Sequence, residues 1–236
     1  MRVLALIPAH NEAANLPAVA AELRQHAPNA DVLIVDDGSD DNTHAVLPAL
    51  NVRWLRMPVQ VGVGTAVRTG LRYARAHDYD IVVRLDGDGQ HPAALIAPLV
   101  APILAGRADV TMGSRYATER RPPEVPFSRR LLHYALGRVL SVLTGRLVTD
   151  PTSGFWAFNR RAIELLADHH PSGYPEPELQ MFLSRNRMRV MEVAVAMRGR
   201  LAGRTTLTLR RTGASMARLI LHLVVVPLRA SVKGRT

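Results

Sequence analysis

The feature that most constrains this chain of 236 residues is a regular alternation of short apolar runs with segments of helical periodicity. Apolar runs at 2–8, 31–35, 52–56 and 80–85 are typical of buried strands. Between them lie 12–26, a segment ending at Leu50, and 62–77, which we expect to be helical. This alternation predicts an α/β fold with a parallel sheet, helices on both faces and right-handed crossovers.

The second half of the chain continues the pattern less regularly. We expect helices at 92–105, 128–144, 161–168 and 176–186, strands at 110–115, 155–158 and 190–197, and a polar loop at 116–127. No internal repeat interrupts the pattern. We therefore expect one domain over residues 1–212 and a basic, apolar tail over 213–236.

Charge is distributed unevenly along the chain. The net charge is +10, and residues 185–236 contain 12 basic residues but Glu192 as their only acid. A basic C-terminal segment of this kind can bind the phosphates of a nucleic acid, a lipid headgroup or a nucleotide, or it can simply be exposed to solvent. Nucleic acid is disfavoured, because no aromatic residue follows Phe182 to stack on bases. The absence of cysteine excludes disulfides, zinc–thiolate sites and thiol catalysis.

The tail contains an apolar run at 216–228, flanked by arginines and broken by Pro227. A helical bilayer span needs about 20 apolar residues, so this run is too short to cross. It suits a helix lying in the headgroup layer, or one packed on the domain or on a second copy. No secretory signal is visible at the N-terminus.

A pair of acids follows the fourth apolar run, in Asp86-Gly87-Asp88-Gly89-Gln90-His91. Ligands of open α/β sheets bind at the carboxyl ends of the strands. Hard cations such as Mg²⁺ take one or two carboxylates together with substrate phosphates. Gly87 leaves room for a ligand against the backbone. We therefore predict a metal–diphosphate site here.

Three other readings of this stretch are weak. An EF-hand would need Glu where Ala97 stands. Phosphatases with an aspartate nucleophile usually recruit a lysine, and the only lysine is Lys233. A dinucleotide-binding fingerprint, Gly-x-Gly-x-x-Gly, would follow the first strand. The nearest match, Gly62-x-Gly64, follows the third strand and has Val67 in place of the last glycine.

Asp36 and Asp37 form a second acidic cluster after the second apolar run, and Arg115 ends a later one. The two acids suit a base or ribose, although Asp-Asp-Gly-Ser is also a common turn sequence. The Arg115 guanidinium suits bidentate recognition of a phosphate, although a lone arginine is more often a surface residue. His10 and His91 flank the predicted site, and we assign neither a role.

Ordered motifs connect these residues to a known family. They are Pro8-x-x-Asn11-Glu12, Val35-Asp36-Asp37-Gly38-Ser39-x-Asp41-x-Thr43, Gly62-x-Gly64, Asp86-x-Asp88-x-Gln90-His91-Pro92, Gly113-Ser114-Arg115 and Asp150-x-x-Ser153-Gly154-Phe155. The chain resembles the inverting family 2 glycosyltransferases of GT-A fold over roughly residues 3–205. It is most similar to the branch that makes polyprenyl-phosphate (dolichol-phosphate) mannose and glucose.

The resemblance implies a role for each matching residue. Pro8, Asn11 and Glu12 would line the nucleotide pocket, with Asp36 or Asp37 on base or ribose and Gly87 beside the nucleotide sugar. Asp86 and Asp88, with Gln90, would hold Mg²⁺ or Mn²⁺ against the diphosphate. Arg115 and one of Arg129 or Arg130 would bind the acceptor phosphate. Arg200 and Arg204 would lie near the diphosphate, although Arg204 and Thr205 stand where the family more often has an acid and serine.

These implications predict a metal-dependent hexosyltransferase that uses GDP-mannose or UDP-glucose and acts on a polyprenyl phosphate. The alternative is a soluble enzyme of the same family acting on a sugar or small-molecule hydroxyl. A hydroxyl acceptor would need a general base, for which Asp150 is our candidate, although Asp-Pro is also a turn sequence. We expect a cytoplasmic protein at the membrane surface. Larger members of the family add transmembrane helices, so any such anchor would come from a separate protein or be absent.

Overall fold

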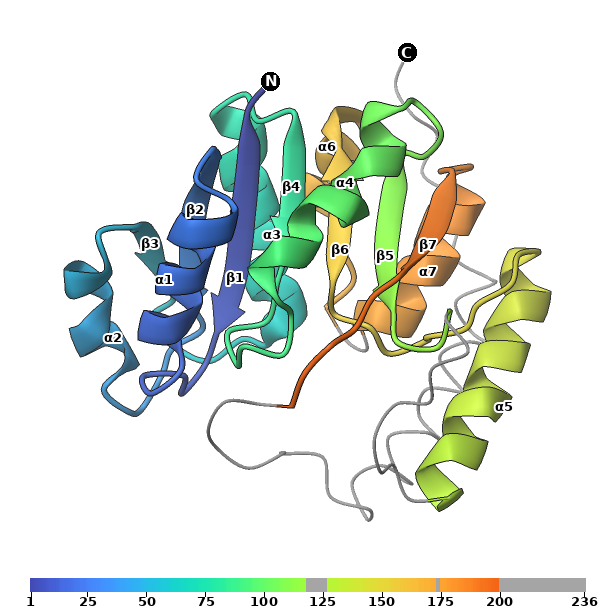
Figure 1. The fold of residues 1–236 in the computed structure, drawn as a ribbon, viewed down its shortest axis with the longest axis horizontal. Helices are drawn as coiled ribbons and strands as arrows, with labels where there is room; N and C mark the ends of the chain where they lie inside the picture. The colour runs from blue at the N-terminus through green and yellow to red at the C-terminus, as the bar shows by residue number, and fades with distance from the viewer. Residues whose placement is uncertain (118–126, 173–174, 200–236) are drawn as a thin grey trace.

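A seven-stranded sheet forms the centre of the molecule, in the order β3-β2-β1-β4-β6-β5-β7 (Figure 1). The computed structural model describes residues 1–117, 127–172 and 175–199, with the backbone alone for 127–132 and 175. The strands are β1 (Val3–Ala9), β2 (Ala30–Asp36), β3 (Arg53–Arg56), β4 (Ile81–Arg84), β5 (Val110–Ser114), β6 (Trp156–Asn159) and β7 (Val190–Ala194). All neighbours are parallel except β6, which runs antiparallel to β4 and β5.

Helices connect the strands and cover both faces of the sheet (Figure 1). They are α1 (Leu16–His26), α2 (Thr43–Val46), α3 (Val63–Ala76), α4 (Ile96–Leu104), α5 (Phe127–Thr144), α6 (Arg160–His169) and α7 (Pro175–Arg185), with short 3₁₀ turns at Leu47–Leu50 and Ala93–Leu95. None of the helices in the described ranges is both long enough and apolar enough to cross a membrane.

The core consists of two apolar layers, one on each face of the sheet. In β1, Ala5 and Ile7 pack with α1 and α4, whereas Leu4 and Leu6 pack with α3, and all four residues are fully buried. Strands buried on both faces read as continuous apolar runs, which explains the pattern seen in the sequence. Each fully buried leucine or isoleucine contributes about 2 kcal/mol.

The predicted alternation and the mostly parallel sheet are confirmed, with two differences. First, β6 is antiparallel, because the chain enters it from the carboxyl edge of β5 and returns directly along that strand. Second, α1 begins at Leu16 and not at Glu12. The backbone of Asn11 has a φ of +58°, outside the helical region, and a turn follows in which Asn15 N–H donates to Glu12 O at 2.9 Å.

The topology brings loops far apart in sequence to one edge of the sheet, the lower edge in Figure 1. The parallel strands end there, and the antiparallel β6 begins there, with Trp156 opposite Arg84 and Met112. The chain moves outward from β1 to β2 and β3, then returns to the other side of β1 with β4. Ligands of open α/β sheets bind at such a reversal of strand order.

Candidate active site

The loop after β2 holds the acids Asp36 and Asp37, both of which are buried. Oδ1 of Asp36 accepts hydrogen bonds from the backbone N–H and hydroxyl of Ser39, at 3.0 and 2.6 Å, while Oδ2 lies 3.5 Å from Arg56 Nε. The two oxygens of Asp37 accept from the N–H groups of Val61 and Gly62, at 2.9 and 2.8 Å. Both acids therefore hold neighbouring loops in place at this edge.

Asn11 and Glu12 join the loop after β1 to the same region. The side-chain oxygen of Asn11 accepts from the N–H groups of Asp40 and Asp41, at 2.9 and 3.2 Å. The backbone N–H of Glu12 donates to Thr43 Oγ1 at 2.9 Å, and its carboxylate accepts from Asn15 Nδ2 at 2.6 Å. Pro8, near the end of β1, is buried and lies opposite Val35 of β2.

Asp86 and Asp88 lie in a tight loop after β4. Asp88 is buried and its Oδ1 accepts the N–H of Gln90 at 3.0 Å. The side chain of Asp86 is 35% exposed, and its backbone N–H donates to His91 Nδ1 at 3.0 Å. Because Nδ1 accepts this bond, the ring proton of neutral His91 is on Nε2, which faces Asp86 Oδ2 at 3.9 Å. Burial lowers the pKa of His91 and keeps the ring neutral.

Two glycines leave room around these acids. A Cβ at Gly154 would lie 2.5 Å from Asp86 Oδ2, and one at Gly87 would lie 3.3 Å from Glu12 Cγ. No cluster of three or more histidines and acids suited to a metal occurs in the described part of the chain. Two carboxylates and the Gln90 amide nevertheless fit an ion such as Mg²⁺ or Mn²⁺, whose remaining ligands would be phosphates and water.

Arg84 is a charged residue in the buried strand β4 and is 2% exposed. Its Nη2 lies 2.9 Å from Glu176 Oε1 on α7 and 3.5 Å from Asp86 Oδ1. Burial opposes the charge on Arg84, but the two carboxylates outweigh it and raise the pKa of the guanidinium. Arg84 thus lies between Asp86 and Glu176 and links the acidic loop to α7.

Arg198, just after β7, fastens the chain to the acidic loop. Its backbone N–H donates to Gln90 O at 3.2 Å, and its Nε donates to Gly89 O at 2.6 Å. Its Nη2 also pairs with Glu22 of α1. The other oxygen of Glu22 accepts the N–H of Ala93 at 2.9 Å, so α1 holds the loop at Ala93 and, through Arg198, at Gly89 and Gln90.

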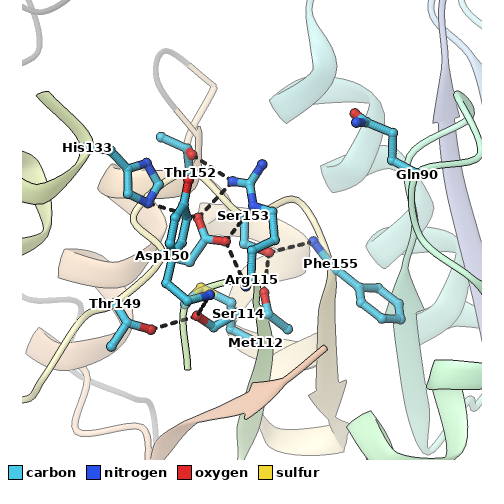
Figure 2. Close-up of polar contacts among 12 residues, drawn as sticks. Gln90, Met112, Ser114, Arg115, His133, Thr149, Asp150, Thr152, Ser153 and Phe155 are labelled. Carbon is cyan, nitrogen blue, oxygen red and sulfur yellow. Dashed lines mark hydrogen bonds and ion pairs between the residues drawn. The ribbon is translucent and has the colours of Figure 1, made fainter. Parts of the chain in front are cut away.

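Arg115 and Asp150 form a bidentate ion pair at the end of β5 (Figure 2). Nε and Nη2 of Arg115 donate to Asp150 at 2.7 and 2.8 Å, and the Arg115 N–H donates to Oδ2 at 3.2 Å. Nη2 also donates to Thr152 at 3.1 Å. Asp150 is fully buried, whereas the side chain of Arg115 is 32% exposed. Burial would raise the pKa of Asp150, but Arg115 outweighs it and holds the pKa below its usual range.

His133 of α5 lies on the other side of Asp150 (Figure 2). Its Nε2 is 3.5 Å from Asp150 Oδ1, and its ring packs against Tyr116 with centroids 4.4 Å apart. Burial lowers the pKa of His133, despite the nearby carboxylate. Asp150 is therefore enclosed by two nitrogen-bearing side chains.

The carboxyl edge thus carries a loop with two acids and an arginine held by a buried carboxylate. A family model described as glycosyl transferase family 2 matches residues 5–166, which include both features. The chain is a family 2 glycosyltransferase. This confirms the family resemblance seen in the ordered motifs.

Relatives of this glycosyltransferase are similar over most of its length. The undecaprenyl-phosphate mannosyltransferase of Micrococcus luteus is 31% identical over 205 residues, covering 83% of each chain. The UDP-N-acetylglucosamine–dolichyl-phosphate N-acetylglucosaminyltransferase of Methanococcus voltae is 30% identical over 210 residues, covering 80% of this chain and 83% of the relative.

A solved structure confirms the fold of the glycosyltransferase. It is the glucosyl-3-phosphoglycerate synthase of Mycobacterium tuberculosis, in complex with Mn²⁺, uridine diphosphate and phosphoglyceric acid. The TM-score is 0.72 at 24% identity, and the match covers 95% of this chain and 78% of that one.

The structure brings most of the predicted site residues of the glycosyltransferase to one edge. Pro8, Asn11, Glu12, Asp36, Asp37, Asp86, Gly87, Asp88, Gln90, Arg115 and Asp150 all lie there. Arg129 and Arg130 are in the first turns of α5, but their side chains are outside the described part. Arg200, Arg204 and the predicted tail at 213–236 also lie outside the described residues.

Sequence reasoning missed the residues that hold the site of the glycosyltransferase in place. Arg84 carried one signal, because a charge within an apolar strand needs a buried partner. Glu176, Glu22 and His133 carried none, since their partners come from distant segments. Arg198 lay unnoticed among the arginines near the end of the chain.

Proposed function

We propose that this glycosyltransferase transfers a hexose from a nucleotide sugar to the phosphate of a polyprenyl phosphate. The observation that carries the proposal is Arg115, a partly exposed guanidinium oriented by buried Asp150 at the edge that also holds Asp86 and Asp88. Two relatives that match most of the chain are named as transferases to undecaprenyl phosphate and dolichyl phosphate.

The donor half of the site is formed by the loops after β1, β2 and β4. We propose that Asp86, Asp88 and Gln90 hold Mg²⁺ or Mn²⁺ and that Pro8, Asn11, Glu12 and Gly87 line the nucleotide-sugar pocket. A divalent cation held there would neutralise charge on the departing nucleoside diphosphate. Asp36 and Asp37 are assigned to the base or ribose side of the pocket, where they hold the loops after β2 and β3 in place.

The acceptor half is formed by the loops after β5 and before β6. We assign the acceptor phosphate to Arg115, together with Arg129 or Arg130 from the start of α5. A guanidinium is the preferred partner for bidentate phosphate recognition. Arg200 and Arg204 are assigned to the diphosphate.

The chemistry is a direct displacement that inverts the anomeric carbon. An oxygen of the acceptor phosphate forms a bond to that carbon as its bond to the diphosphate oxygen breaks. The second pKa of a phosphate monoester is about 6, so the acceptor is largely ionised at neutral pH and needs no strong base.

Asp150 fits this chemistry as a positioning residue for Arg115. It is fully buried, both of its oxygens accept hydrogen bonds from Arg115, and its pKa is lowered. A general base works best with a pKa near the operating pH. These properties favour the phosphate acceptor over the hydroxyl acceptor for which we considered Asp150 as base.

The test mixes the protein with Mn²⁺, a set of nucleotide sugars and short polyprenyl phosphates. The set includes GDP-mannose, UDP-glucose and UDP-N-acetylglucosamine, and products are separated by solvent extraction. We expect a sugar–lipid phosphate with one donor. Transfer only to a soluble hydroxyl acceptor such as 3-phosphoglycerate would overturn the proposal.

We also propose that the protein works at the cytoplasmic face of a membrane, with a separate anchor protein as a partner. The position of a lipid-phosphate acceptor requires such contact. Liposome flotation of the full chain and of a chain truncated after Thr212 tests the tail. Equal flotation of the two proteins would assign no membrane role to residues 213–236.

A further inference from the structure

A second polar network lies beside the Arg115–Asp150 pair and takes no part in the chemistry proposed above. Its base is Glu192 of β7, the strand next to β5. Oε1 of Glu192 accepts the backbone N–H of Thr149 at 2.9 Å, and Oε2 accepts the Thr149 hydroxyl. Thr149 directly precedes Asp150, so β7 holds the segment that carries the buried carboxylate.

The direction of the hydrogen bonds in this network follows from the carboxylate. An ionised carboxylate can only accept, so the Thr149 hydroxyl donates its proton to Glu192. The Thr149 oxygen therefore accepts from the Ser114 hydroxyl, whose oxygen lies 2.6 Å away. The Ser114 oxygen in turn accepts the backbone N–H of Tyr116 at 3.2 Å. The bonds run one way, from the β5 end to Glu192.

This network binds the chain neighbours of both residues of the Arg115–Asp150 ion pair. Ser114 and Tyr116 flank Arg115 in the chain, and Thr149 precedes Asp150, so each partner of the pair has a neighbour bound to Glu192 directly or through one hydroxyl. An arginine side chain loses rotamer freedom when it is fixed. A network that fixes it before the acceptor arrives lowers the cost of binding.

We propose that Thr149 and Glu192 are positioning residues that set the orientation of Arg115 toward the acceptor phosphate. The proposal rests on the function proposed above for Arg115. Neither residue needs to touch a substrate. Their effect would therefore fall on acceptor binding and leave donor binding unchanged.

The first experiment compares Thr149→Val with Thr149→Ser. Valine has a similar shape but no hydroxyl, whereas serine keeps the hydroxyl that joins Ser114 to Glu192. In Thr149→Val we expect the KM for the polyprenyl phosphate to rise about ten-fold, as for a lost bond to a charged group. The KM for the nucleotide sugar should stay within about two-fold, since none of the hydrogen bonds of this network reaches a residue of the donor loops. Thr149→Ser should behave like the wild type in both values.

A second measurement does not depend on the acceptor. The ¹⁵Nε–H signal of Arg115, assigned with an Arg115→Lys spectrum, reports whether the guanidinium is held in one orientation. We expect a sharp signal in the wild type and Thr149→Ser, and a broadened one in Thr149→Val. Ser114→Ala breaks the same network at another link and replaces Thr149→Val should that variant not fold.

The outcomes separate the two proposals. Equal acceptor KM values and equal Arg115 signals in wild type and Thr149→Val would overturn the positioning role. Equal losses of donor and acceptor binding would also overturn it, because they indicate a general structural defect. A wild type that transfers nothing to polyprenyl phosphate would overturn the proposed function, and the Arg115 signal would still decide the positioning role.

Discussion

The carboxylate of Asp86 lies against the backbone of Gly154, a residue from the loop that enters β6. A Cβ at position 154 would lie 2.5 Å from Oδ2 and 3.0 Å from Oδ1 of Asp86. Since no side chain can share that space with the carboxylate in its present position, the loop that enters β6 limits the position of the Asp86 carboxylate.

Gly154→Ala should therefore displace the Asp86 carboxylate with little effect on overall stability. The end of a short side chain can rotate away, but Asp86 would then leave the orientation that suits a cation. Changes to residues that orient metal ligands typically cost about 10- to 100-fold in metal affinity. Mn²⁺ titration followed by electron paramagnetic resonance measures the loss. Gly199→Ala is the matched control, because a Cβ there meets nothing within 4 Å. Unchanged Mn²⁺ affinity in Gly154→Ala would contradict the metal assignment of Asp86.

Asp88→Asn should abolish metal-dependent nucleotide binding. Asp88 is buried and held by the N–H of Gln90, so the variant keeps its shape and loses only the charge. Loss of electrostatic stabilisation at a reacting centre typically costs at least about 100-fold in turnover. Turnover and calorimetric binding of nucleotide with and without Mn²⁺ measure the effect. Glu164→Gln, at an exposed site on α6, serves as control. Retained metal-dependent binding would refute the role of Asp88.

Arg115→Met should lower both stability and activity, because it leaves the buried Asp150 carboxylate without its main partner. We expect a loss of about 2 kcal/mol in the free energy of unfolding. Adding Asp150→Asn removes the unpaired charge and should restore most of that stability, whereas activity stays low. Urea unfolding and turnover of the single and double variants measure the two effects. Recovery of activity in the double variant would show that Arg115 does not serve the acceptor.

His170 should make the fold sensitive to mild acid. Burial lowers the pKa of His170 to about 3, whereas the unfolded value is about 6.5. The folded ring is neutral, so its contribution to stability is complete above about pH 6.5 and is lost as the pH falls toward 3. Each pH unit in that window costs about 1.4 kcal/mol.

Urea unfolding between pH 7 and pH 4 measures this dependence. His170→Gln keeps an N–H donor for Pro171 O, which lies 2.8 Å from Nδ1, and should flatten the curve. His26→Gln, at the exposed end of α1, is the control for a histidine-to-glutamine change at the surface. Parallel curves for wild type and His170→Gln would argue against a neutral, buried ring.

Much of the fold was predictable because buried strands and amphipathic helices have distinct periods. The apolar runs of β1 and β4 predicted strands buried on both faces. Asp86 and Asp88 come directly after the β4 run, so their place at the carboxyl end of that strand was also predictable. The direction of β6 was not predictable, since a run as short as Phe155–Phe158 fits either direction equally well. The late start of α1 depended on the backbone of Asn11. Its positive φ cannot be seen in the periodicity of the sequence.

The candidate site was predictable in its residue types and not in its pairings. The sequence offers Asp150 either as a base for a hydroxyl acceptor or as a turn residue, whereas its partner Arg115 comes from a strand end earlier in the chain. Glu176 and Glu22 lie on helices whose outward faces look ordinary in sequence. Which acid meets which arginine depends on strand order, and strand order was not encoded in any local pattern.

The antiparallel strand β6 returns the chain to the same edge of the sheet that it left after β5. The chain leaves the sheet after Ser114 and re-enters it at Trp156, on the adjoining strand and at the same edge. The segment between β5 and β6 starts and ends on adjacent strands, so it can change in length or sequence without shifting the register of β1 to β4. Within this architecture, the part of that segment away from Gly154 can vary while the strands that carry Asp36 and Asp86 keep their register.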